Sequence, residues 1–196
     1  PRRARGLLRV DALLAAAAEV FAAKGFDAAT MTEIAAQSGS SIGSLYQFFR
    51  TKEAVAEALL GTQVDALWVR LDGLAERAPA LATPDLGRAL ASCLVDFRAD
   101  HPSFATLVER PGAPSPLVAG VRRKVRERVE AILVRHAPHA DRKALHAMAP
   151  VVQQVMKSAV QLRADLEGAD LKAAARELET MLAGYLSARL APGAPR

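Results

Sequence analysis

Apolar residues recur along the whole chain at the spacing of amphipathic helices. The first such segment has intervals of three and four residues, with Val10, Leu14, Ala17 and Phe21. No segment sustains the alternation of apolar and polar residues that marks a half-buried strand. Alanine, the strongest helix former, occurs 42 times among the 196 residues. The pattern predicts an all-α protein.

Caps, glycines and prolines predict where the helices begin and end. Lys24 and Gly25 suit the last turn and the left-handed C-cap of the first helix. Thr51 suits the N-cap of a long helix to about Arg77, and the proline-containing linker over 79–84 is a candidate boundary between functional halves. Beyond it the sequence predicts a helix capped by Thr83, a short helix after Pro102, a loop over 111–116 and a helix over 117–136. Asp141 can cap a further helix that reaches Gly168, and Pro150 kinks or divides that helix. Asp170 caps the last helix, which runs to about Leu190.

The segment 30–49 predicts two short helices joined by a tight turn. Thr30 and Glu33 have the spacing of a capping box, which starts the first of these helices. Gly39 suits the left-handed conformation that ends it, and either of the two serines that follow can cap the second helix. Two short helices around a glycine turn form a helix-turn-helix.

In a helix-turn-helix the N-terminal part of the second helix enters the major groove, while nearby donors contact phosphates. Glycine lets the backbone approach closely, and serine and glutamine can bond to base edges. The candidate groove residues are Ser41, Ile42, Gly43, Ser44 and Gln47. The candidate phosphate contacts are Tyr46, Lys52 and Arg50. For Ile42 two interpretations stay open, contact with a thymine methyl and partial burial beside Leu45 and Phe49.

Four linked segments resemble the DNA-binding region of the tetracycline-repressor (TetR) family. They are Phe21–Phe26, Thr30–Ala35, Gly39–Phe49 and Thr51–Ala54, and the resemblance covers about residues 8–60. Carried over by position, the family's base contacts fall on Thr32, Ile42, Gly43 and Ser44, and its phosphate contacts on Tyr46 and Lys52. The chain departs from the family pattern at three positions. Ser40 replaces a common valine, Ile42 stands where a basic or polar residue is common, and Arg50 replaces a common proline.

The resemblance implies a sequence-specific, DNA-binding transcriptional regulator, a repressor that a small-molecule ligand releases from a near-palindromic operator. It implies a homodimer with a helix-turn-helix DNA-binding domain and basic N-terminal arm in residues 1–53, and a helical ligand-binding and dimerisation domain in residues 54–196. The residues expected to line the ligand pocket are Trp68, Phe97, Phe104, Gln153 and Met156. The apolar residues expected at the dimer contact are Val155, Ala159, Leu162, Leu178, Met181, Leu182 and Tyr185. The alternatives are a ligand-binding helical protein with a vestigial helix-turn-helix, and a small helical enzyme.

The net charge of +5 is concentrated in two segments. Residues 1–9 carry +4 and residues 117–145 carry +5, whereas residues 10–49, which hold the reading helices, carry −3. We therefore expect DNA affinity to come from a few placed donors rather than from bulk charge. The first arginines form either a solvated tail or an arm that reaches DNA. The basic residues over 122–128 form either a solvent-exposed helix face or a second nucleic-acid or membrane site.

Composition argues against several other classes of protein. Cys93 is a single cysteine, which excludes an internal disulfide and favours a cytoplasmic protein. The longest apolar run, residues 12–18, is far shorter than the roughly 20 residues that span a bilayer. His136, His139 and Asp141 are weak metal candidates, because a proline separates them at a helix end. No catalytic spacing or phosphate-binding loop stands out, so we expect no enzyme activity, cofactor or metal.

Overall fold

The computed structural model describes residues 2–108 and 115–191, and within them every regular element is a helix. The prediction of an all-α protein is confirmed. The chain divides into two compact units. The N-terminal unit comprises Pro1–Ala66 and Asp100–Val118, and the C-terminal unit comprises Leu67–Ala99 and Ala119–Arg196. The helix α4 contributes residues to both.

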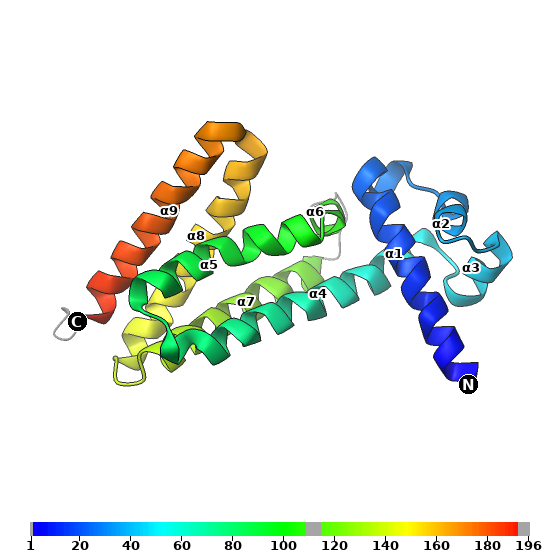
Figure 1. Cartoon of the computed structure of the whole chain (residues 1–196). Helices are drawn as coiled ribbons and strands as arrows, with labels where there is room; N and C mark the ends of the chain where they lie inside the picture. The colour runs from blue at the N-terminus through cyan, green and yellow to red at the C-terminus, as the bar shows by residue number, and fades with distance from the viewer. Residues whose placement is uncertain (1, 109–114, 192–196) are drawn as a thin grey trace. The chain divides into compact units, whose positions relative to one another are not determined.

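The N-terminal unit consists of four helices and the first part of a fifth. They are α1 (Arg2–Ala28), α2 (Met31–Gln37), α3 (Ile42–Phe48), α4 (Lys52–Arg77) as far as residue 66, and α6 (Ser103–Val108) (Figure 1). α1 contacts both α2 and α6. The apolar face of each helix supplies the core, whose fully buried side chains include Leu13, Phe21, Ile34, Leu45 and Val55.

The sequence predicts that the first helix ends at Gly25, whereas α1 breaks there and resumes for one more turn. Gly25 has φ 77° and ψ 168°, a conformation that costs glycine little because it lacks a Cβ, and the helical turn that follows ends at Ala28. At the other end, the basic segment predicted as an arm has a helical backbone from Arg2 onward. The side chains of its first three arginines lie outside the described part of the structure.

A buried polar pair joins α4 to α6 inside the N-terminal unit. Gln63 is 4% exposed and its Nε2 donates to Oγ of Ser103, which is fully buried, over 2.7 Å. Burying polar groups is tolerated when they are hydrogen-bonded to each other. The pair therefore fixes the position of α6, which begins just after Pro102 as predicted.

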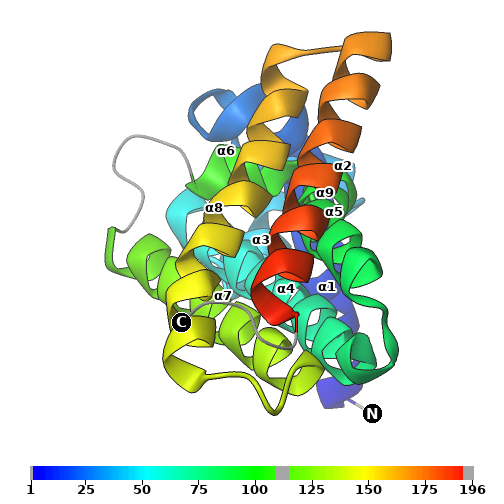
Figure 2. The ribbon, with the colours of Figure 1, turned by 90° about the vertical axis from the view of Figure 1, so that its left-hand side faces the viewer.

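The C-terminal unit is built from longer helices. They are the remainder of α4, a short 3₁₀ turn (Ala78–Ala80), α5 (Thr83–Asp100), α7 (Ser115–His136) from residue 119 onward, α8 (Arg142–Asp165) and α9 (Gly168–Leu190). α8 and α9 lie side by side and run antiparallel (Figure 2). α8 continues through Pro150 without ending there. Across the described ranges, none of the helices combines the length and apolarity needed to cross a bilayer. The loop predicted over 111–116 falls mostly outside the described residues.

Two of the four predicted caps outside the helix-turn-helix are confirmed. Oγ1 of Thr51 accepts from the amide of Ala54 over 3.1 Å, and the carboxylate of Asp141 accepts from the first amides of α8. The prediction that Thr83 and Asp170 cap helices is wrong. α5 begins at Thr83 itself, and α9 begins at Gly168, which puts Asp170 in its first turn.

Thr83 does not cap α5 because its hydroxyl has a tertiary partner. It lies 3.0 Å from Nε2 of His136, whose Nδ1 lies 2.8 Å from the carbonyl oxygen of Ala78. A carbonyl oxygen only accepts, so Nδ1 carries a proton, and in the neutral ring Nε2 accepts from the hydroxyl. His136 thus links the end of α7 to both sides of the predicted linker. Among the described residues, no three His, Cys, Asp or Glu side chains are grouped as metal ligands.

α5 and α9 approach each other closely at Gly87. A Cβ added there would meet the backbone Cα of Ala183 on α9 at 2.6 Å. We predict that Gly87→Ala lowers the free energy of unfolding by about 1–3 kcal/mol, because α5 and α9 must move apart. Gly73→Ala is the matched control, since nothing lies within 4 Å of a Cβ there. It should be neutral or stabilise the protein by up to about 1 kcal/mol. Denaturant unfolding at one protein concentration measures both, and equal effects would contradict the contact.

Candidate nucleic-acid interface

The capping box predicted at the start of α2 is present. The amide of Glu33 donates to Oγ1 of Thr30 over 3.2 Å, and the amide of Thr30 donates to the Glu33 carboxylate over 3.0 Å. Lys24 Nζ lies 2.5 Å from the other Glu33 oxygen. The bond from Lys24, with those from Thr30, lowers the pKa of the Glu33 carboxyl below its ordinary value of 4.5.

The turn between α2 and α3 also has the predicted geometry. Gly39 has φ 66°, and the amide of Ser40 donates to the carbonyl oxygen of Ala35 over 2.9 Å, which closes the C-terminus of α2. Of the two candidate serines, Ser41 is the N-cap of α3, because its Oγ accepts from the amide of Ser44 over 3.2 Å. Ala35 and Leu45 are buried on the facing sides of the two helices. The segment is a helix-turn-helix.

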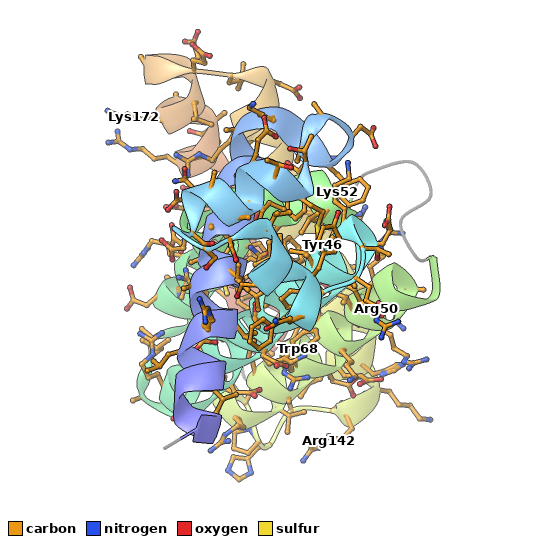
Figure 3. All side chains as sticks on the ribbon, turned by 90° about the vertical axis from the view of Figure 1, so that its right-hand side faces the viewer. Tyr46, Arg50, Lys52, Trp68, Arg142 and Lys172 are labelled. Carbon is orange, nitrogen blue, oxygen red and sulfur yellow. The ribbon has the colours of Figure 1, made fainter. Side chains whose placement is uncertain are left out.

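α3 presents a mixed apolar and polar surface to solvent. Ile42 is 39% exposed and Tyr46, one turn later, is 49% exposed, so Ile42 is partly buried and the rest of its side chain faces solvent. Most other candidates for base contact are exposed as well, namely Thr32, Ser41, Gly43 and Gln47. Phe48 is also 39% exposed, which sequence reasoning missed because an aromatic residue at this spacing is usually buried. Tyr46 and Arg50 can be followed in Figure 3.

Ser44 is the exception among the candidate DNA contacts. It is only 8% exposed, and its Oγ has no hydrogen-bond partner within the described residues. A hydroxyl turned toward the helix-turn-helix core is not available to a base edge in this conformation. The packing of α3 requires a small side chain at Ser44, because a larger one would push α3 outward.

Lys52 differs most from its predicted role. Its Nζ donates to three carbonyl oxygens at the end of α1, those of Phe26 at 2.7 Å, Asp27 at 2.9 Å and Ala29 at 2.8 Å. The ammonium also lies 4.6 Å from the centroid of the Phe26 ring. The prediction of a phosphate contact rested on the position of Lys52 in the first turn of α4. Sequence alone could not reveal the carbonyls, which lie 23 to 26 residues earlier.

Family models match both parts of the chain. Residues 13–59 match the model described as bacterial regulatory proteins, tetR family. Residues 84–186, more than half of the chain, match the model described as tetracyclin repressor-like, C-terminal domain. The chain belongs to the tetR family. The members of this family are regulators of transcription rather than enzymes.

Similar proteins agree with this assignment. The transcriptional repressor KstR2 of Mycolicibacterium smegmatis is 39% identical over 70 residues, which cover 36% of this chain and 34% of that protein. The match thus spans about a third of the length of that curated relative. A TerR/AcrR-family regulator from Aquifex aeolicus has a TM-score of 0.64 at 14% identity over 91% of this chain and 98% of the other. FadR of Bacillus subtilis, solved with stearoyl-CoA, has a TM-score of 0.60 at 16% identity over 88% and 96%. The two structures share the fold of this tetR-family chain.

Four of the five residues expected to line a ligand pocket, Trp68, Phe97, Gln153 and Met156, belong to the C-terminal unit. Phe104 belongs to the N-terminal unit, and Phe97 and Met156 are almost fully buried in the core of the C-terminal unit. The guanidinium of Arg128 lies over the ring of Trp68, with 4.3 Å between Cζ of Arg128 and the ring centroid. Arg128 also forms an ion pair with Asp72. Gln153 donates from Nε2 to the carbonyl oxygen of Arg122 over 2.7 Å.

A cavity of ≈ 230 Å³ lies elsewhere in the C-terminal unit, between α5, α8 and α9. None of the five expected residues lines it. Small and apolar side chains form part of the wall, and charges of both signs form the rest. The lining residues are Ala91, Ser92, Val95, Asp96, Ala159, Arg163, Leu171, Lys172, Ala175 and Glu179. Which side chains face a cavity depends on how the helices cross, and no local sequence pattern encodes this.

The lowered pKa of Glu33 gives the helix-turn-helix a testable pH dependence. Its pKa is lower in the folded than in the unfolded protein, so the charged carboxylate stabilises the fold above about pH 4.5. That stability is lost as the pH falls through the folded-state value. We predict that the difference in melting temperature between the wild type and Glu33→Ala is largest near pH 6 and narrows toward pH 3.

Glu57→Ala is the control for this experiment, because Glu57 is exposed on α4 and has no hydrogen-bond or ion-pair partner among the described side chains. Its difference from the wild type should stay constant over the same range. A difference in melting temperature between the wild type and Glu33→Ala that does not change with pH would show that the charge of the Glu33 carboxylate contributes nothing to stability.

Proposed function

We propose that the protein is a sequence-specific transcriptional repressor that binds a near-palindromic operator as a homodimer and is released by a small molecule. The observation that carries this proposal is the surface of α3, a short helix that begins at the Ser41 side-chain cap directly after the glycine turn. Its exposed residues combine an open backbone at Gly43, an amide at Gln47 and an apolar group at Ile42. Such a surface suits base edges and a thymine methyl in the major groove.

Placed donors rather than bulk charge account for affinity in this proposal. Residues 10–49 carry a net charge of −3, so the reading helices do not form a basic patch. Exposed donors are available beside them at Tyr46 and Arg50, and the amides at the start of α4 are a further favourable site for an anion. Thr32, at the start of α2, extends the same set. The affinity for DNA should therefore fall with salt concentration as expected for a few phosphate contacts.

The homodimer is expected to form through α8 and α9. Val151 on α8 is 46% exposed and Met181 on α9 is 53% exposed, and large apolar side chains at such exposure favour a protein contact. Val155, Leu162, Leu178 and Tyr185 are partly exposed on the same two helices. Leu182 and Ala159 are buried within the single chain, which supports an intramolecular role for them. Two α3 helices about 34–36 Å apart would then match successive major grooves.

The cavity between α5, α8 and α9 is the ligand site we propose. Its volume of ≈ 230 Å³ falls just below the roughly 300–1,000 Å³ of typical small-molecule sites. Part of the wall is apolar, and the charged part contains two acids and two bases, namely Asp96, Glu179, Arg163 and Lys172. This combination favours a small amphipathic molecule that carries an ionised group. Such a ligand releases DNA only if it binds better to a state in which the two α3 helices misfit the operator.

Selection from a random duplex library tests the proposed DNA binding. The purified protein should enrich one two-fold symmetric sequence whose half-site centres lie about 10 base pairs apart. Arg50→Ala should weaken binding and reduce the slope of log affinity against log salt by about 1, because one phosphate is no longer neutralised. Arg126→Ala, an exposed arginine on α7, is the matched control and should change neither quantity. A vestigial helix-turn-helix would instead enrich no sequence.

A thermal-shift screen of small amphipathic acids and amines tests the ligand site. Compounds that bind the cavity should raise the melting temperature of the wild type and dissociate the selected duplex. Ala175→Phe, which fills the cavity, should abolish both effects, whereas Ala173→Phe on the exposed face of α9 should preserve them. Binding that survives Ala175→Phe would place the ligand elsewhere.

A further inference from the structure

The three carbonyl oxygens around Lys52 Nζ form a closed set of acceptors, which we call the carbonyl cradle (Phe26, Asp27 and Ala29). The distances of 2.7, 2.9 and 2.8 Å are those of strong, charge-assisted hydrogen bonds. An ammonium has three donors and no acceptor. All three donors of Lys52 are therefore used within the protein, and a phosphate oxygen could bind Nζ only if one of these bonds broke.

The local electrostatics favour the cradle over solvent. Lys52 is the first residue of α4, where the positive end of the helix dipole disfavours a cation. The ammonium instead lies against three carbonyl oxygens in and just after the short turn that follows the break at Gly25, and their partial negative charges favour a cation. The face of the Phe26 ring, 4.6 Å away, adds a further attraction. Phe26 and Ala29 are themselves buried, so the cradle belongs to a rigid part of the N-terminal unit.

The cradle connects the start of α4 to the segment that determines where α2 begins. Ala29 is followed directly by Thr30, the N-cap of α2, and α2 leads through the turn at Gly39 to α3. Lys52 itself follows the turn that leaves α3. Lys52 therefore closes a loop of residues 26–52 that contains the whole helix-turn-helix, because its side chain at one end of the loop bonds to the carbonyl oxygens at the other end.

We propose that Lys52 is a positioning residue, which fixes the orientation of α3 for operator binding by holding the carbonyl cradle, and that it is not a phosphate contact. The proposal rests on the proposed DNA-binding function, which it refines. It makes the cradle, rather than DNA, the partner of the ammonium in both the free and the bound protein. Loss of Lys52 should then affect how well α3 fits its sequence and leave the number of phosphates contacted unchanged.

The first test needs no DNA. In ¹⁵N-lysine NMR spectra of the free protein, the Lys52 ammonium should exchange its protons with water much more slowly than exposed lysines such as Lys143, because its donors are shielded. Lys52→Met, which keeps most of the aliphatic stem, identifies the resonance by its absence. Exchange as fast as that of Lys143 would overturn the proposal, whether or not the protein binds an operator.

The second test compares salt slopes on the selected duplex. Lys52→Met should lower operator affinity by about tenfold or more and reduce the ratio of operator to non-specific binding, while the salt slope stays that of the wild type. Arg50→Ala, the reference for a true phosphate contact, should reduce the slope. A slope for Lys52→Met that falls as it does for Arg50→Ala would overturn the proposal.

Lys52→Arg separates positioning from charge. Arginine keeps the positive charge and binds phosphate well, but its planar fork cannot direct three donors at the three converging carbonyls. We expect Lys52→Arg to resemble Lys52→Met in its affinity and specificity ratio, with helical content and melting measured to confirm that both are folded. Full binding by Lys52→Arg would contradict positioning. If the wild type enriches no duplex, the proposed function fails, and the exchange measurement still decides whether the cradle exists.

Discussion

The helices that would read DNA are too short to hold their shape alone. α2 and α3 have seven residues each, whereas isolated helices shorter than about 12–15 residues are marginal in water. Their conformation therefore depends on contacts at their ends and on one buried face. Thr30 and Ser41 satisfy the first amides, Gly39 allows the turn, and Leu45 supplies the packed side chain. Everything proposed for the function of this chain depends on that small assembly.

The same constraint explains how a locally acidic segment could bind DNA. The Glu33 carboxylate stabilises this assembly through the capping box and the ion pair with Lys24. Its negative charge therefore has a structural role besides repelling DNA phosphates. The large basic segment of α7 is used differently, since Arg128 covers Trp68 and pairs with Asp72 inside the C-terminal unit. Net charge is thus a poor guide here, because position decides which charges face a ligand and which hold the protein together.

The features that could be predicted from sequence are those that depend on neighbouring residues. The capping box at Thr30, the break at Gly25, and the caps at Thr51 and Asp141 each involve residues within a few positions of each other, and all are present. Thr83 and Lys52 depart from their predicted roles because their partners are distant in the sequence. Thr83 faces His136, 53 residues later, and therefore does not cap α5. Lys52 satisfies carbonyls at the end of α1, and the cavity depends on how three helices cross.

The most direct test of this account is the structure of the protein bound to its selected duplex. In that structure α3 should lie in the major groove, with Ile42, Gly43 and Gln47 toward the bases and Arg50 beside a phosphate. Nζ of Lys52 should remain within hydrogen-bond distance of the carbonyl oxygens of residues 26, 27 and 29, as in the free protein. Lys52 Nζ on a phosphate oxygen, or α3 outside the groove, would contradict it.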